Sequence, residues 1–471
     1  MTGGLKTTTS RVAIAAALGL FMGGLGLSPA QAADLGGDCC ADLEERVAEL
    51  EATTVRKGNR KVSVRVSGQV NYMVLVWDDG EDTDAYIVDN VESSSRFRFT
   101  GSAKFKPGWS AGFLMEIEFD GANSSSVSQV SDGAPRENQD ASLDGRKIAW
   151  YIKSDRLGEI WVGRYSPATD DITLINLADT PNVDASNEVG NGFFLRVPQG
   201  TAGCAGTGCL INATLGAVAP SVDPRRGEVI RYNTPSLGGF VFSVAWGEDD
   251  DFDVAVRYKK EWNSIQLAGG IGYRWDTDET ETTNAIACPD PVPGNSGFGA
   301  GTGPCRGFDF DLEQLLGSVS VMHTPTGLYA YFAGSHGEFN DAFRGAVTGR
   351  GRGDISQWYL QGGVKRRWLA RNLGATTVYG EYQEFDGFLE GTSGASFAGA
   401  AGLGGIVEIA STEVQSWGFG VVQDIDKAAM QLWASFREFE PEVDVVNNAG
   451  ATASTPLEDF WTVQLGGKLK F

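Results

Sequence analysis

Segments in which apolar and polar residues alternate one by one are the feature that most limits what this chain can fold into. In residues 109–119, "WSAGFLMEIEF", every odd-numbered residue is apolar, and the even-numbered ones include Ser110, Glu116 and Glu118. The same alternation occurs in residues 264–275 and again in the terminal "EDFWTVQLGGKLKF". A period of two is that of a strand with one apolar and one polar face. The alternation therefore predicts an all-β fold.

About sixteen such segments can be counted, each of about 9–15 residues, which is the length that a tilted strand needs to cross a lipid bilayer. Beyond the first thirty or so residues, no apolar run is long enough to cross a membrane as a helix. The expected strands begin near residues 62, 94, 109, 145, 157, 227, 239, 252, 264, 309, 327, 355, 373, 412, 427 and 458.

The connections between these segments are alternately long and short, and only residues 248–251 break the pattern. The long ones are 78–93, 120–144, 166–226, 277–308, 338–354, 387–411 and 439–457. A soluble β-sandwich has no reason to alternate in this way, whereas an outer-membrane barrel has tight turns at one end and long loops at the other. The sequence predicts a closed transmembrane antiparallel β-barrel of 16 strands over residues 61–471, with the last strand paired to the first.

The twelve tryptophans support this prediction, because each lies within or at the edge of an expected strand. Amphipathic rings favour the headgroup level of a bilayer. We expect this position for the tryptophans at strand ends, which are Trp77, Trp109, Trp262, Trp275 and Trp368.

The N-terminal 60 residues are expected to lie outside the barrel. Residues 1–32 have the basic start, short apolar run and Ala-x-Ala site of a secretory signal peptide. Residues 33–60 are expected to form a periplasmic segment with a short helix, either a plain extension or an element of self-association. The role of Cys39 and Cys40 is undecided. Because export permits disulfides, we predict the pairs Cys204–Cys209 and Cys288–Cys305.

The charge and the residue types exclude several functions. A formal net charge of −23 argues against nucleic acid as a partner. With only His323 and His336, a histidine-based metal centre is improbable, and so is a barrel enzyme, which would need a nucleophile and a base within reach. We predict no enzymatic activity, no metal and no cofactor.

If the apolar faces of the strands contact lipid, the other faces line a channel. A charged side chain on the lipid face costs about 2–4 kcal/mol at the bilayer midplane, so basic residues on the polar parity are expected to point inward. These are Arg65, Arg96, Arg98, Arg231, Arg257, Lys259, Lys365 and Lys468. They could form a basic wall, or be salt-bridged to inward acids such as Glu116 and Glu118, and the two roles are compatible.

The longest connection, residues 166–226, is the best candidate to fold inside and narrow the channel. A barrel of sixteen strands is otherwise wide enough for a large aqueous bore. Acidic residues of this connection would face the basic wall and create a transverse field; they are Asp170, Asp171, Asp179, Asp184 and Glu188. The alternative is an external surface loop.

The chain resembles the outer-membrane general porins of alphaproteobacteria of the Rhizobiales type. The resemblance rests on "ADLGGDCCADLEERVAELEATTVRKGNRKVSVRVSGQVN", "RYSPATDDI", "YNTPSLGGF" and "VQLGGKLKF". It implies a homotrimer of sixteen-stranded barrels, each with an inward third loop carrying the five acids above, and passive diffusion of small hydrophilic solutes. It also implies a terminal strand, with Trp461, Leu469 and Phe471, that is read by the outer-membrane assembly machinery. Outer-membrane lipid and lipopolysaccharide are the expected surroundings, with loops extracellular and both termini periplasmic.

Two questions stay open at the level of sequence. The alternative to a general pore is a substrate-specific channel with an aromatic track, to which Tyr151 could contribute. The sign of ion selectivity is also undecided, because the net charge favours cations at the mouth while a basic wall favours anions inside.

Overall fold

The computed structural model describes residues 62–132, 142–180, 185, 189–201, 209–224, 226–248, 251–278, 310–339, 353–368, 373–405 and 407–471. The predicted signal peptide and the N-terminal segment with its helix lie outside these ranges, so both stay predictions. Within the described ranges, no helix has the length and apolar character that a membrane-crossing helix requires.

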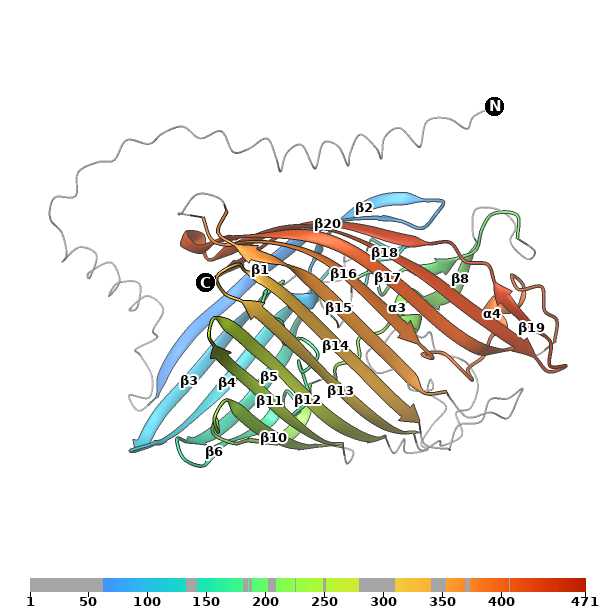
Figure 1. The fold of residues 1–471 in the computed structure, drawn as a ribbon. Coiled ribbons are helices and arrows are strands. Elements are labelled where there is room, and N and C mark those ends of the chain that lie inside the picture. The colour runs from blue at the N-terminus through green and yellow to red at the C-terminus, as the bar shows by residue number, and fades with distance from the viewer. Residues whose placement is uncertain are drawn as a thin grey trace, which may run out of the picture. The chain divides into compact units, whose positions relative to one another are not determined.

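The main sheet has eighteen strands, of which sixteen form the wall of a closed antiparallel barrel (Figure 1). The predicted fold class and number of strands are confirmed. The wall strands are β1 (Ser63–Asp78), β3 (Arg96–Lys106), β4 (Trp109–Asp120), β5 (Ser142–Ser154), β6 (Gly158–Tyr165), β9 (Gly227–Asn233), β10 (Phe240–Gly247), β11 (Phe252–Trp262), β12 (Ile265–Asp278), β13 (Phe310–His323), β14 (Leu328–Phe339), β15 (Ile355–Arg366), β16 (Thr376–Asp386), β17 (Val407–Ile425), β18 (Met430–Asn447) and β20 (Phe460–Lys470).

Two short strands within long connections extend the wall. β2 (Thr83–Asp89) pairs with the second half of β1, and β19 (Thr452–Thr455) pairs with the end of β18. Both lie at the end of the barrel that carries the long connections, here called the long-loop end; the opposite end is the short-turn end. The remaining elements are the hairpin strands β7 (Phe194–Arg196) and β8 (Leu210–Thr214), the helical turns α3 (Leu215–Val218) and α4 (Ala395–Ala398), and the 3-10 turns η1 (Val91–Ser93) and η3 (Asp426–Ala428).

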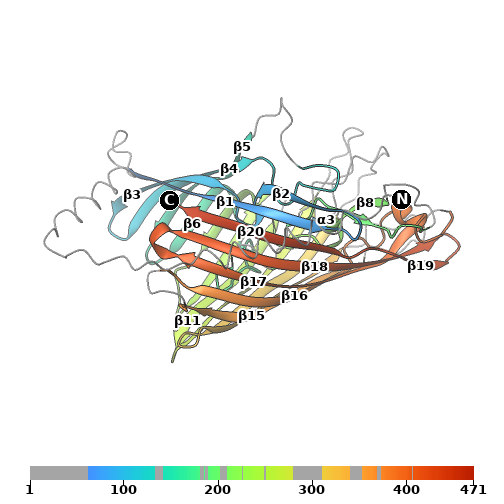
Figure 2. The same cartoon turned by 90° about the horizontal axis from the view of Figure 1, so that it is seen from above.

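The barrel closes where β1 meets β20, as predicted. The pairing runs from Gln69 opposite Lys470 to Asp78 opposite Trp461, and Figure 2 shows β1 and β20 side by side. Below this seam, Gly68 and Phe471 exchange backbone hydrogen bonds of 2.9 and 3.0 Å. The ring of Phe471 lies so close to Gly68 that a Cβ there would be 2.5 Å from Phe471 Cζ. A glycine at position 68 therefore makes room for the terminal aromatic residue.

The last strand shows how alternation divides the two faces of the wall. Thr462 and Gln464 are buried on the inward face, with 0% and 1% exposure, whereas Leu469 is 41% exposed on the outward face. Trp150 and Phe242 are similarly exposed on the outward faces of β5 and β10. An apolar outward surface is what contact with lipid requires.

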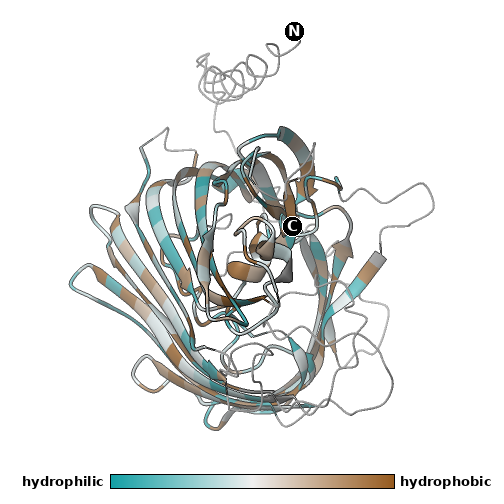
Figure 3. Cartoon of the chain, turned by 90° about the vertical axis from the view of Figure 1, so that its right-hand side faces the viewer, coloured by the Kyte–Doolittle hydropathy of each residue, from teal (hydrophilic) through white to brown (hydrophobic). Residues whose placement is uncertain are grey.

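The long-loop half of the barrel interior contains an apolar core, which was not predicted. Phe193, Leu195 and Leu215, from the connection between β6 and β9, are buried there together with inward residues of β1. Figure 3 shows the strands surrounding chain segments that lie inside them. The interface position expected for Trp77 is wrong: this side chain is 2% exposed, and its ring centroid lies 5.0 Å from that of Phe193. The reason is that the second half of β1 is apolar on both faces, because Phe193 and its neighbours in the β6–β9 connection cover its inward side.

A buried ion pair fastens β7 to the wall. Arg196 of β7 lies 2.7 Å from Asp79, which follows β1, and the two side chains are 4% and 2% exposed. Gln129 Nε2 donates to Asp79 at 3.1 Å and to the Phe194 carbonyl at 2.7 Å. Asp79 therefore links two long connections at the end of β1.

Candidate functional site

The chain turns into the barrel directly after β6. Arg231 Nη1 of β9 donates to the Pro167 carbonyl at 2.8 Å, and Arg257 of β11 donates to the carbonyls of Ala168 and Asp170, each at 2.7 Å. Both arginines lie on the inward faces of their strands. They hold the start of residues 166–180, here called the inner segment, against the inside of the wall.

The middle of the inner segment is held by β11, β13 and β14. Asp253 accepts from the backbone N–H of Thr169 at 2.5 Å and from its hydroxyl at 2.7 Å. Ser318 Oγ donates to the Ile172 carbonyl at 2.6 Å, and the Tyr331 hydroxyl donates to the Thr173 carbonyl. Backbone groups inside a barrel need such partners.

The far end of the inner segment reaches β15. Asn176 Nδ2 donates to Gln361 Oε1 at 2.9 Å, and Lys365 Nζ donates to the Ala178 carbonyl at 2.7 Å. Beyond it, Gln383 Nε2 of β16 donates to the Ala185 carbonyl at 3.1 Å. The inner segment therefore runs through the interior from β9 to β15, which confirms the predicted inward fold of the third long connection and rules out an external course for residues 166–180.

Two glycines of β12 provide space for the inner segment. A Cβ at Gly272 would lie 2.4 Å from Thr169 Cγ2, and one at Gly270 would lie 2.8 Å from Ile172 Cγ1. Any larger residue would push the segment away from the wall and towards the axis. The inner segment can therefore lie against the wall here only because both residues are glycines.

The opposite wall carries a cluster of arginines around one buried carboxylate. Glu116 of β4 is fully buried and contacts Arg96 at 3.2 Å and Arg146 at 2.9 Å; it also accepts from Arg98 Nε at 2.6 Å. Arg146 Nη1 lies 2.6 Å from Glu118. Arg96 and Arg98 thus adopt both roles weighed from the sequence: they are ion-paired, and they lie on the inward face.

Arg146 and Lys147 were missed by the analysis of alternation. The β4–β5 register shifts between Glu116 and Ile117, opposite Arg146, so a β-bulge brings an extra basic residue to the interior. Lys147 Nζ donates to Ser166 Oγ at 2.7 Å, at the entrance to the inner segment. The sequence signal for this bulge was the pair of consecutive basic residues after Gly145. In a regular strand, one of the two would have to face lipid.

Between this wall and the inner segment lies a polar cavity of about 1090 Å³. Arg146 lines it from the wall, and Asp170 and Asp171 line it from the inner segment. Asp223 and Arg226, which precede β9, also line it and were not singled out from the sequence, although both belong to the connection predicted to fold inward. Acidic and basic groups therefore face the same water-accessible space: Glu118 lies beside Arg146 on the wall, and Asp170 of the inner segment lies near Arg226.

Burial changes the ionisation of three carboxyls in the connections. It raises the pKa of Asp89, at the end of β2, to about 6, against hydrogen bonds from Ser95 that lower it. Burial and the adjacent Asp171 raise the pKa of Asp170, which lies 3.8 Å from Arg226. Burial raises the pKa of Asp223 well above its usual value, although the Thr173 hydroxyl donates to it.

The remaining predicted residues are placed as follows. Lys468 is 4% exposed on the inward face of β20, and Gln431 Nε2 beside it lies 3.4 Å from Asp179 Oδ2. Arg65 and Lys259 are exposed on inward parity near the short-turn end. Cys209 is buried. Asp184, Glu188, Cys204, Cys288 and Cys305 lie outside the described residues, so their roles and both disulfides stay predictions.

Tyr151 belongs to an inward aromatic group rather than to an extended track. Its ring centroid lies 4.5 Å from that of Trp161, which in turn stacks on Tyr165 at 4.4 Å. Lys147 Nζ and the Arg231 guanidinium lie 5.4 and 6.0 Å from the Tyr165 ring. The group packs on itself and supports two basic residues beside the inner segment.

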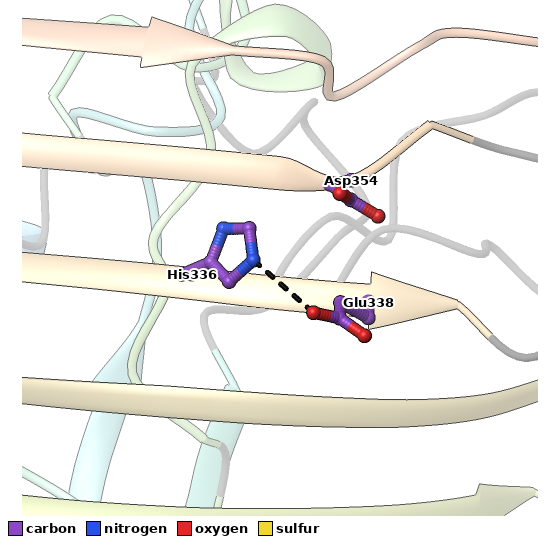
Figure 4. A group of neighbouring side chains, drawn as sticks. All are labelled: His336, Glu338 and Asp354. Carbon is purple, nitrogen blue, oxygen red and sulfur yellow. Dashed lines mark ion pairs between the residues drawn. The ribbon is translucent and has the colours of Figure 1, made fainter.

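The two histidines lie at opposite ends of the barrel. His323 ends β13 at the short-turn end, and its Nδ1 is 2.8 Å from Thr326 Oγ1. His336 lies near the long-loop end of β14, where its Nε2 is 3.5 Å from Glu338 Oε1, with Asp354 nearby (Figure 4). All three side chains of this group are exposed, as expected of polar residues near strand ends.

Comparisons with known proteins give a consistent result. The family model described as Gram-negative porin matches residues 15–440. A search of curated proteins found no match. Among solved structures, the anion-selective porin from Comamonas acidovorans is 15% identical with a TM-score of 0.51, over 87% of this chain and 100% of that chain. OprB of Pseudomonas putida, in its high-pH structure, is 10% identical with a TM-score of 0.52, over 91% and 97%. At these identities the structural likeness shows the fold alone.

Proposed function

The chain belongs to the Gram-negative porin family, and from this premise we propose that it acts as a general pore whose exclusion limit is set by the inner segment. As an outer-membrane barrel of this family, it forms a water-filled channel for passive diffusion of small hydrophilic solutes. The observation that supports a general pore is the polar cavity beside the inner segment, which is lined by both acidic and basic side chains. Such a lining admits hydrated solutes by size and charge without a shaped apolar site.

The proposal is tested by conductance of the purified protein in a planar lipid bilayer. A general pore gives a current that rises linearly with salt concentration and is not blocked by sugars. Saturation of the current, together with block by one class of sugar, would instead indicate the substrate-specific alternative. Absence of any conductance from correctly folded protein would refute channel function.

We also propose that the barrel is oriented with its long-loop end outside the cell and assembles as a homotrimer of the alphaproteobacterial subgroup. The orientation is supported by the short connections at one end, as expected of the periplasmic side. The subgroup and the trimer are supported by the sequence blocks that resemble this subgroup. A single band of trimer mass on unboiled SDS gels, converted to monomer by boiling, is the expected result; a monomer under both conditions would contradict it.

Three further parts of the proposal concern chemistry and partners. The channel performs no catalysis. Its outward face meets lipid and, at the long-loop end, lipopolysaccharide. Phe471, Leu469 and Trp461 are the residues proposed to be recognised by the assembly machinery. Trp461 and Leu469 lie on the outward face of β20 and Phe471 follows it; Leu469 and Phe471 are exposed, and Trp461 is half-buried.

A further inference from the structure

We propose that this channel rectifies ionic current, because its fixed charges are separated along the axis: the lining of the cavity at the long-loop end is net negative, and the inward faces of the strands near the short-turn end are net positive. The inference deepens the proposed function and rests on it, since it concerns ion flow through the same channel. The sign of ion selectivity was left open by the sequence. On this proposal the acidic section of the channel prefers cations and the basic section prefers anions.

The short-turn half is basic on its inward faces. Within the described wall strands, we considered charged residues on inward parity no more than four residues from the short-turn end. Eight are basic: Arg65, Lys104, Lys153, Arg231, Lys259, Lys365, Lys468 and Lys470. Three are acidic: Glu159, Glu261 and Asp424. Eight minus three leaves a formal charge of +5.

The exposed apolar residues next to these charged residues in the strands show that the charged side chains lie on the inward faces. Phe105 is 57% exposed on the outward face, which places Lys104 on the inward face; Ile230 at 47% does the same for Arg231. Lys365 contacts the inner segment directly. These assignments rest on described residues of the wall strands and the inner segment alone.

The cavity at the long-loop end has the opposite sign. Its lining includes seven carboxylic side chains: Asp89, Glu92, Glu118, Asp144, Asp170, Asp171 and Asp223. It includes three guanidinium groups: Arg146, Arg164 and Arg226. Three minus seven gives a formal charge of −4. If the deeply buried Asp223 carboxyl is counted as neutral, because burial raises its pKa, the charge is −3.

This arrangement makes ion flow depend on direction. Cations gather in the acidic section and anions in the basic section, because fixed charges raise the local concentration of counter-ions. A voltage that makes the long-loop side positive drives both kinds of ion towards the junction and fills it. The opposite voltage draws both away and empties it. We therefore expect the larger current when the long-loop side is positive.

Salt concentration provides an internal check. The Debye length is about 30 Å at 10 mM salt, so each charged section acts across the whole bore, and about 3 Å at 1 M, where it acts only at the wall. The ratio of currents at equal and opposite voltages is expected to exceed about 1.5 at the lower concentration and to fall to about 1.1 or less at the higher one. A rectification caused by moving loops would not follow this dependence on salt.

The test uses single channels of the full protein in a planar bilayer with the same KCl solution on both sides. The orientation of each channel is read from the chamber in which a membrane-impermeant thiol reagent modifies the Glu81→Cys variant, since Glu81 is exposed at the long-loop end. The decisive variant is Lys104→Glu with Lys259→Glu. Each substitution changes the charge by two units, which lowers the short-turn section from +5 to +1.

A matched control makes the same charge change on the outward face. Lys106 and Lys260 lie over the rings of Trp109 and Trp262, at 4.1 and 5.5 Å, near the same ends of the same two strands. The double variant Lys106→Glu with Lys260→Glu is expected to keep the wild-type ratio, whereas the inward pair brings the ratio at low salt close to one. If the inward Glu pair does not fold, Lys104→Gln with Lys259→Gln gives the same comparison with half the charge change.

The outcomes separate this inference from the proposed function. Equal currents in both directions at low salt, or an equal effect of the inward and outward pairs, would overturn the charge separation while leaving the channel intact. A larger current with the short-turn side positive would also overturn it. Folded protein that passes no current at all would refute the channel itself.

Discussion

Replacing Gly272 by alanine should narrow the channel, because it adds a methyl group where the inner segment touches the wall. The new Cβ would lie 2.4 Å from Thr169 Cγ2, whereas carbon atoms in ordinary contact are about 3.7 Å apart. Thr169 would have to move by about 1.3 Å, the difference between these distances. It cannot yield by rotating freely, since Asp253 accepts from both its N–H and its hydroxyl.

The structure can respond to the added methyl group in two ways, and both lower its stability. If the two hydrogen bonds to Asp253 are lost, the cost is about 1 kcal/mol for each bond. If they hold, residues near Thr169 move inward as a unit, with an overpacking cost of about 1–3 kcal/mol. Because the wall blocks outward movement, the inward shift is expected to dominate and the bore to lose about 1 Å on this side.

The assay combines single-channel conductance with the rates at which sugars of graded size enter liposomes. Gly272→Ala is expected to lower the conductance and to slow large sugars more than small ones. Gly362→Ala is the control, because the nearest atom to its Cβ, the Tyr329 carbonyl oxygen, is 3.9 Å away. Gly270→Ala, against Ile172, should give a smaller effect of the same sign. Unchanged conductance and size dependence in folded Gly272→Ala would refute the idea that this glycine sets the position of the segment.

Three other changes probe the wall, the cavity and the seam. Arg437→Met removes the cation that lies 3.0 Å from the buried Glu381 carboxylate. It should lower the free energy of unfolding by about 3–5 kcal/mol, so that the band of the folded barrel on an SDS gel is lost at a lower temperature. Adding Glu381→Met should restore much of this stability. Burial raises the pKa of Asp89 to about 6, so its carboxyl is charged above that pH and neutral below it. The preference of the channel for cations, measured by reversal potential in a salt gradient, should therefore fall as the pH drops through 6. In Asp89→Asn this fall should be absent. Phe471→Ala should reduce the folded fraction in the outer membrane, whereas Phe105→Ala, 57% exposed against 63% for Phe471 but outside the seam, should not.

Alternation along the strands was enough to predict the number of wall strands and the pairing of the last with the first. This worked because a side-chain period of two ties each residue to one face, and a one-residue slip would exchange the lipid face and the interior. Leu469 outward and Gln464 inward follow directly from that rule. The inward course of the third long connection was also predicted, from its length and the width of the barrel.

What the sequence did not reveal depends on contacts between distant segments. Alternation cannot show the bulge that brings Arg146 inward, because a bulge is an exception to the period. It could not show that Trp77 is covered by Phe193, since the two are brought together only by the folded connection. Gly272 carries no signal of its own either: its role exists only because Thr169 lies against it.

Because β20 pairs with β1 on one side and β18 on the other, the barrel cannot close before Phe460–Lys470 has joined the sheet. Without Phe460–Lys470, β1 lacks a partner along Gln69–Asp78 and β18 lacks one along Met430–Phe439, so both keep unpaired backbone groups there. Such an edge is not tolerated in hydrocarbon and invites pairing with other chains in water. Loss of β20 alone would therefore open the barrel and leave two strand edges that hydrocarbon does not tolerate.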